Sequence, residues 1–116
     1  MKTSQAENLL INLNSLAECK GSIAFKIAYN IHKLTDELHE YVQFKQELFK
    51  KYGEEVDGQL SISKDSEHIQ DFLNELKKLD VDIDVHLLKI TEDELKDSNL
   101  TAKEMAMIWE LYDGND

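Results

Sequence analysis

Proline and arginine are absent from the 116-residue sequence, and cysteine occurs once, at position 19. A single cysteine cannot form an intramolecular disulfide, so we expect a fold held together by packing, in a reducing, cytoplasmic setting. Cys19 itself is expected to be a buried small apolar residue rather than a nucleophile. Without arginine, the chain lacks the side chain best suited to phosphates and guanine edges, which argues against direct nucleic-acid binding.

Long apolar runs and glycine-rich loops are also missing. No run approaches the roughly 20 apolar residues needed to cross a bilayer, and the first residues, MKTSQAENLLINLN, lack the apolar segment of a signal peptide. We therefore expect no membrane partner. The four glycines are dispersed at turns, and no phosphate-binding loop or nucleophile motif occurs. We expect a protein that is not an enzyme, binds no cofactor and folds as one domain over residues 1–116.

Acidic residues outnumber basic ones only in the second half of the chain. Residues 1–52 carry a net charge of +1 and residues 53–116 carry −12, which gives −11 overall. An acidic surface can bind a basic protein partner, including a nucleic-acid-binding protein whose channel it enters in place of nucleic acid. The simpler alternative is that the charge serves solubility.

Apolar periodicity predicts two helices in the first half. Residues 5–19 place leucine and alanine at helical spacing, and Gly21-Ser22 separates this helix from a long one over residues 23–52. The long helix repeats its apolar residues at alternating steps of four and three, which is a heptad seam. The members of the seam are Ile27, Ile31, Leu34, Leu38, Tyr41, Lys45, Leu48 and Tyr52.

The first helix is too short to cover this seam. A helix of thirty residues spans roughly 45 Å, and residues 5–19 reach along only about half of it. The rest of the seam needs the second half of the chain or another subunit, so we expect a homodimer. The predicted oligomer interface consists of Phe25, Tyr41, Phe44 and Leu48.

The second half predicts shorter elements. Asp57-Gly58 is a turn signal followed by alternation, and two capping boxes begin at Thr91 and Thr101. The expected elements are a strand at 59–63, a helix at 66–79, a strand at 80–88, a short helix at 92–97 and a helix at 102–112. The predicted fold class is α+β and mainly helical: a helical hairpin with one long helix, a small two-stranded β element and C-terminal helices.

The stretch LDVDIDVHL, residues 79–87, has two interpretations. Aspartates at 80, 82 and 84 match the first ligands of a calcium loop, but such a loop needs glycine at its sixth position and glutamate at its twelfth. Those positions hold Val85 and Thr91, so the calcium interpretation fails. The alternation favours a strand that pairs with 59–63, with apolar residues on a buried face. These are Val81, Ile83, Val85 and Leu87.

The acidic face of this predicted strand is the candidate partner-binding site. It consists of Asp80, Asp82, Asp84 and His86. Carboxylates at alternate positions would attract a basic partner, or alternatively would keep an exposed sheet edge from pairing with other chains.

One face of the long helix contains histidines and is the only candidate metal site in the sequence. His32, Asp36 and His39 lie at helical spacing, and such residues can bind Zn or Fe in an open site of a metal-dependent enzyme. No second segment supplies the matching acidic and histidine residues that metal sites in helical bundles use. We therefore expect a solvated helix face and no metal site.

Aromatic and aliphatic residues recur near the C-terminus at helical spacing. They are Met105, Ile108, Trp109 and Tyr112. This stripe favours a core position for Trp109, with an interface anchor as the alternative.

The chain resembles a family of small proteins of unknown function that phages and prophages of low-GC Gram-positive bacteria encode. The resembling segments are residues 26–31 (KIAYNI), 51–54 (KYGE), 72–76 (FLNEL), the alternation of 80–87, and 100–104 (LTAKE). The family often has proline before the long helix and after the threonine of the last capping box, where this chain has none and carries Ala102. The resemblance implies expression in the cytoplasm of a bacterial host and supplies no active site.

These observations leave several functions open. We expect a non-catalytic phage accessory protein that binds another protein and inhibits a host defence system. The first alternative is a helper in virion assembly or in the tail region. Less favoured alternatives are a small-ligand sponge at a subunit interface and a metal-dependent enzyme that uses the histidine-containing face.

Overall fold

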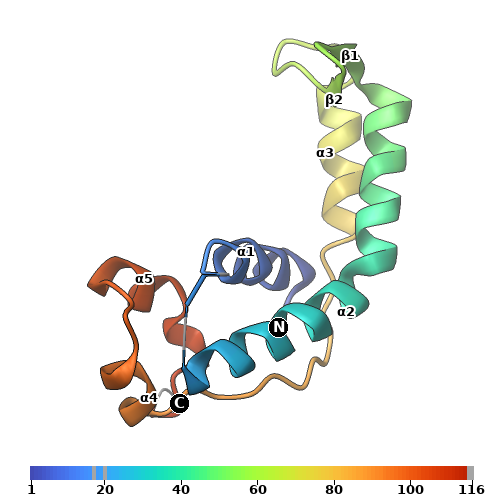
Figure 1. Ribbon diagram of the computed structural model, residues 1–116. Coiled ribbons are helices and arrows are strands. Elements are labelled where there is room, and N and C mark those ends of the chain that lie inside the picture. The colour runs from blue at the N-terminus through green and yellow to red at the C-terminus, as the bar shows by residue number, and fades with distance from the viewer. Residues whose placement is uncertain (17, 20, 115–116) are drawn as a thin grey trace.

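The computed structural model describes residues 1–16, 18–19 and 21–114 and is mainly helical (Figure 1). Its elements are α1 (Thr3–Asn14), α2 (Ser22–Tyr52), β1 (Glu54–Val56), β2 (Gln59–Ser61), α3 (Ile69–Lys78), α4 (Glu92–Asp97), α5 (Ala102–Met107) and the 3-10 helix η1 (Trp109–Leu111). The molecule is L-shaped, with extents of 51 × 30 × 21 Å. One limb, which we call the base, holds α1, the first half of α2, α4, α5 and η1; the other, the arm, holds the second half of α2, the hairpin and α3.

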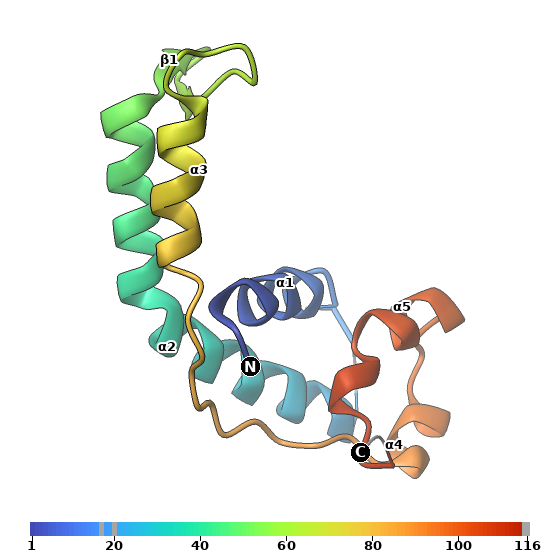
Figure 2. The ribbon, with the colours of Figure 1, turned by 180° about the vertical axis from the view of Figure 1, so that it is seen from behind.

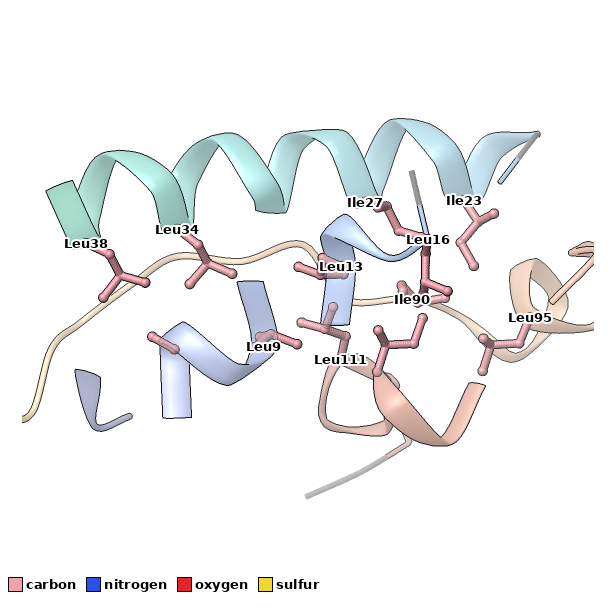
Figure 3. Packing of buried hydrophobic residues seen from close by; sticks show 12 residues of the cluster. Leu9, Leu13, Leu16, Ile23, Ile27, Leu34, Leu38, Ile90, Leu95 and Leu111 are labelled. Atoms are coloured by element: carbon pink, nitrogen blue, oxygen red, sulfur yellow. The ribbon is translucent and has the colours of Figure 1, made fainter. Parts of the chain in front are cut away.

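The core of the protein lies in the base. Here α1 packs along the first half of α2, and the C-terminal elements close the side of this pair (Figure 3). The buried residues of this cluster are Ala6, Leu9, Leu13, Leu16, Ile23, Ile27, Leu34, Leu38, Ile90, Leu95, Ile108 and Leu111. Those on α2 belong to the predicted heptad seam or extend it by one step, because steps of four and three keep residues on one helix face.

The arm is a pair of antiparallel helices with the β hairpin at its tip (Figure 2). The axis of α2 changes direction where the base meets the arm. Within α2, the Thr35 hydroxyl donates to the Ile31 carbonyl at 2.7 Å, a back-bond that often accompanies helix bending. Within the arm, the rings of Phe49 and Phe72 lie 4.9 Å apart, and Phe72 is buried between the helices.

Residues 79–91 connect the two limbs as an extended segment beside the first half of α2 (Figure 2). The predicted strand at 80–88 is wrong: within the described residues this segment forms only an isolated bridge of Asp82 with Lys2, and a further one follows at Ile90 with Tyr112. Its neighbour is a helix, which has no free backbone groups for a ladder. The inward-facing apolar side chains still pack against the core, with the exception of Val81, which is 51% exposed.

The side chain of Asn30 makes the hydrogen bonds to the extended segment that a neighbouring strand would otherwise make. Asn30 is fully buried on α2; its Oδ1 accepts from Leu88 N–H at 2.7 Å and its Nδ2 donates to the Leu88 carbonyl at 3.0 Å. This pair of bonds reproduces what a neighbouring strand would make, and so satisfies buried backbone groups. One helical turn earlier, Lys26 Nζ donates to the Lys89 carbonyl and to Glu94, both at 2.6 Å.

The β element is a local hairpin rather than a parallel pair. The strand predicted at 59–63 is shorter, spanning Gln59–Ser61, and pairs antiparallel with β1 instead of with residues 80–88. Asp57 (φ 53°) and Gly58 (φ 81°) both adopt positive φ, as a tight two-residue hairpin turn requires.

Several helix boundaries differ from the expected ones. The helix predicted at 66–79 begins later, at Ile69, and the one predicted at 102–112 breaks at Ile108 into α5 and η1. The first helix ends at Asn14 instead of residue 19, and position 17 of the expected helix lies outside the described residues. The mainly helical character of the prediction is confirmed.

Candidate protein-interaction surfaces

Asp80, the first member of the predicted acidic site, is engaged within the chain. Its carboxylate accepts from Ser4 N–H at 3.0 Å and from the Thr3 hydroxyl at 3.2 Å, at the N-terminus of α1. The pKa of Asp80 is lowered, mainly by the hydrogen bonds from Ser4 and to a smaller extent by Thr3 and the charge of Lys2. The Thr3 hydroxyl also donates to the Leu79 carbonyl at 2.8 Å. Asp80 therefore caps the N-terminus of α1, although the two are 76 residues apart in the sequence.

The remaining members of this predicted site lie on the outer side of the extended segment. Asp82 is exposed and lies 3.7 Å from Lys2 Nζ, whereas Asp84 and His86 are exposed side chains between inward-facing Ile83, Val85 and Leu87. An exposed ion pair of this kind contributes little to stability, so Asp82 can exchange Lys2 for a partner.

The histidine-containing face of α2 is solvated. His32 Nε2 and Asp36 Oδ2 lie 3.4 Å apart, and His39 is exposed one turn further on. Among the described residues, no three His, Cys, Asp or Glu side chains lie together in a way that could hold a metal ion.

Cys19 is half-buried against the core in a shallow polar hollow that includes Glu104. Burial raises the pKa of the Cys19 thiol, and the charge of Glu104 adds to this. A thiol with a raised pKa is a poor nucleophile at neutral pH.

A hollow with a mixed polar and apolar lining lies at the tip of the arm, between the hairpin and the loop before α3. It has a volume of about 490 Å³, and the His68 and Tyr52 rings at its wall lie 6.1 Å apart. Serine hydroxyls and carboxylates make up most of the remaining lining. Val56, which is 54% exposed, and Ile62 add an apolar part to this lining.

The C-terminal unit presents an apolar hollow of about 510 Å³. Its lining comprises Ala102, Met105, Ala106 and Trp109. The predicted stripe divides at the break between α5 and η1: Ile108 points into the core, but Trp109 is 50% exposed. The core position expected for Trp109 is therefore wrong, because the helix does not continue with α-helical geometry through Ile108 (ψ 20°).

The residues that flank this hollow are fixed by ring stacking and by backbone hydrogen bonds. The Trp109 ring stacks on Tyr112 with centroids 4.8 Å apart and planes inclined by 22°. Around it, Ile90 N–H donates to the Leu111 carbonyl at 2.8 Å, and Asp113 N–H donates to the Ile90 carbonyl at 2.9 Å. Trp109 is thus held in place by its neighbours while half of its surface remains open to solvent, which is typical of an anchor side chain in a protein interface.

The hollow belongs to an acidic part of the chain. Residues 91–113 contain seven Asp or Glu and two Lys. Glu104 closes the capping box of α5, and the hydrogen bonds from Thr101 lower its pKa, so it is ionised at neutral pH. Burial raises the pKa of Glu110, next to Trp109.

The predicted oligomer-interface residues separate into three places. Phe44 and Leu48 line one groove between α2 and α3, together with Leu79. Tyr41 lies in another hollow, at the inner corner of the L, beside Lys45. Phe25, which is 69% exposed, lies at the start of α2 beside Tyr29.

No helix in the described part of the chain is both long enough and apolar enough to span a membrane. Comparison with known proteins finds no matching family model, no matching curated protein and no matching solved structure.

Proposed function

We propose that this chain is a non-catalytic phage accessory protein that binds another protein and thereby inhibits a host defence system. The observation that carries the proposal is the apolar hollow of α5 and η1, with Trp109 half-exposed at its edge. Large aromatic side chains held in place at the edge of a small apolar depression provide much of the binding energy in protein interfaces. The phage assignment rests on the sequence resemblance described above.

The hollow favours a partner with both apolar and basic groups. Ala102 and Ala106 are small, so a bulky apolar side chain of the partner can approach the α5 backbone between Met105 and Trp109. The surrounding excess of carboxylates would steer a lysine- or arginine-rich surface to this site. A nucleic-acid-binding protein of the host offers such a surface, and is the partner class that we propose.

Affinity capture from a lysate of a low-GC Gram-positive host tests the proposal. We expect the wild-type chain to retain one basic host protein at a constant ratio, and a Trp109→Ala variant to retain at least about tenfold less, since hot-spot truncations cost about 2 kcal/mol or more. Ile11→Ala is the matched control, because Ile11 is 60% exposed on α1, outside the hollow. Equal capture by all three chains, or capture of none, would contradict the proposal.

An infection assay tests the biological part. We expect expression of the wild-type chain to restore plating of a phage that the defence system restricts, and the Trp109→Ala variant to fail despite equal abundance. If plating is unchanged by either chain across the defence systems that contain the captured protein, the inhibitory role is wrong even where binding is real.

A helper in virion assembly is the second candidate. The observation that favours it is the arm, which extends a helical hairpin away from the base and so offers helix faces for self-association. Here the chain should be recovered with purified particles or assembly intermediates. Its absence from both, together with capture of a host protein, would decide for the first candidate.

A further inference from the structure

The arm buries its apolar side chains less completely than the base does. On α2, Ile23, Ile27, Leu34 and Leu38 in the base are at most 2% exposed. In the arm, the seam residues Tyr41, Leu48 and Tyr52 are only half-buried, and Phe44 is 53% exposed. Two helices alone cannot enclose a core, because each keeps one flank in water. The described part of the chain therefore leaves apolar side chains of the arm without full cover.

The open flank of the arm is an apolar groove with charged borders. Phe44, Leu48 and Leu79 form its apolar part, in a volume of about 350 Å³. Its charged members are Glu47, Lys51, Glu75 and Lys78, two of each sign. A two-fold symmetric interface places each side chain of one copy against a side chain of the other, so a groove that carries both charges can pair its carboxylates with the lysines of a copy of itself.

The local charge allows two copies to meet at this groove. The arm helices, residues 41–52 and 69–79, contain five Lys and three Asp or Glu, although the whole chain has a net charge of −11. Two copies would repel each other at the C-terminal unit, through its acidic surface. A foreign basic segment, in contrast, gains nothing from a groove without excess negative charge.

Of the charged groups at the groove, Lys51 and Glu75 already interact within the chain, and Lys51 Nζ also lies 5.0 Å from the centroid of the Tyr52 ring. Lys51 Nζ lies 3.4 Å from Glu75 Oε1, which is longer than the about 2.7–2.9 Å of a strong charge-assisted hydrogen bond. No ion pair within 4.0 Å is found for Glu47 or Lys78 among the described residues. Glu47 and Lys78 are thus available for bonds across an interface.

We infer that this groove is the interface of a homodimer, in which a second copy of the chain packs its own groove against the first. The two α2–α3 pairs then form a four-helix bundle that encloses Phe44 and Leu48, while carboxylates of each copy face lysines of the other. Of the four interface residues predicted from sequence, this assignment keeps these two. It leaves out Phe25, which is 19 residues before Phe44, about 28 Å of helix.

Light scattering coupled to size exclusion is the first test. We expect the wild-type chain to show twice the 13.4 kDa chain mass at roughly 100 µM and to dissociate on dilution. Phe44→Asp should shift it to monomer, whereas Phe25→Asp, the matched change on the same helix, should leave the dimer intact. A wild-type chain that remains monomeric at the highest concentration overturns the inference, and so does equal disruption by both variants.

Charge reversal tests the proposed pairing without requiring that either altered chain dimerise alone. A Glu47→Lys/Glu75→Lys chain carries four lysines at the groove, and a Lys51→Glu/Lys78→Glu chain carries four carboxylates. Each alone should dimerise about tenfold or more weakly than the wild type, and an equimolar mixture should recover a heterodimer. Circular dichroism of each chain checks that both are folded. Folded chains whose mixture stays monomeric while the wild type is dimeric would place the interface elsewhere.

Discussion

At the scale of single residues, Asn30 shows how one side chain determines the course of a long segment. An asparagine amide carries a donor and an acceptor in the same geometry as a peptide group. On α2 it is fully buried and bonds both backbone groups of Leu88, so residues 79–91 can lie along a helix without a strand beside them. Its replacement would leave two buried backbone groups unsatisfied.

We predict that Asn30→Ala lowers the free energy of unfolding by about 1–3 kcal/mol, the range for leaving buried polar groups unpaired. Asn8→Ala, at an exposed position of α1, is the matched control and should change little. Urea denaturation of both variants measures the difference. A loss of stability that is the same for both would show that the Leu88 bonds are unimportant.

Gly53 is a second residue whose identity is fixed by its surroundings. Its φ of −92° suits any residue, but a Cβ there would lie 2.6 Å from two backbone oxygens, those of Phe49 and Ser61. Backbone atoms cannot move aside as a flexible side chain can. We predict that Gly53→Ala destabilises the chain by about 1–3 kcal/mol through overpacking.

Thermal unfolding of Gly53→Ala, compared with an alanine at exposed Gln59 on the same hairpin, measures this effect. Full stability of the alanine variant at position 53 would mean that the hairpin does not approach the end of α2 as closely as described.

At the scale of elements, α1 is tied to the junction between α3 and the extended segment by the Asp80 carboxylate. The hydrogen bonds from Ser4 and Thr3 favour the ionised form and lower the pKa of Asp80 below its ordinary value. A carboxyl whose pKa is lower in the folded state stabilises the fold above its unfolded pKa, about 3.9, and loses this contribution as pH falls through the lower folded value.

We therefore predict that Asp80→Asn has a lower midpoint of thermal unfolding than the wild type at pH 7, and that the difference shrinks as pH falls below about 4. Asp84→Asn, which removes an exposed carboxylate from the same segment, should differ less from the wild type at pH 7. A gap between wild type and Asp80→Asn that stays constant from pH 7 to pH 2 would contradict the capping role.

The elements differ in how far they could be predicted from the sequence. The heptad seam and the two capping boxes depend on local spacing, and α2, α4 and α5 begin where these signals predict. The alternation marks an inner and an outer side correctly from Asp82 to Leu87, whereas Val81 is exposed and Asp80 is bonded to α1. It cannot reveal that the neighbour is a helix with a buried asparagine, because the pairing of Asn30 with Leu88 joins distant parts of the chain.

Of two further errors, one had a signal in the sequence that points to the structure and the other had none. Asp57-Gly58 between short extended segments indicates a hairpin with residues on both sides, so β1 could have been predicted from the turn. The exposure of Trp109 depends on the break at Ile108, where helical spacing no longer applies. Nothing local in the sequence indicates that break, since the apolar stripe continues across it.

At the scale of the whole molecule, the two limbs of the L differ in core and in charge. The base encloses a continuous apolar core and ends in the acidic C-terminal unit, whereas the arm is half-open and close to neutral. This separation lets one chain contact a copy of itself through the arm and a basic partner through the C-terminal hollow. The two proposals rest on different residues and can fail independently.

Amide hydrogen exchange of the wild-type chain, alone and with its captured partner, tests the central claim most directly. The short α5 and η1 should exchange quickly in the free chain, because short helices open readily. We predict that the partner slows exchange over residues 102–112 and leaves the arm unchanged. Slowed exchange confined to other residues, with 102–112 as fast as in the free chain, would contradict the assignment of the C-terminal hollow as the binding site.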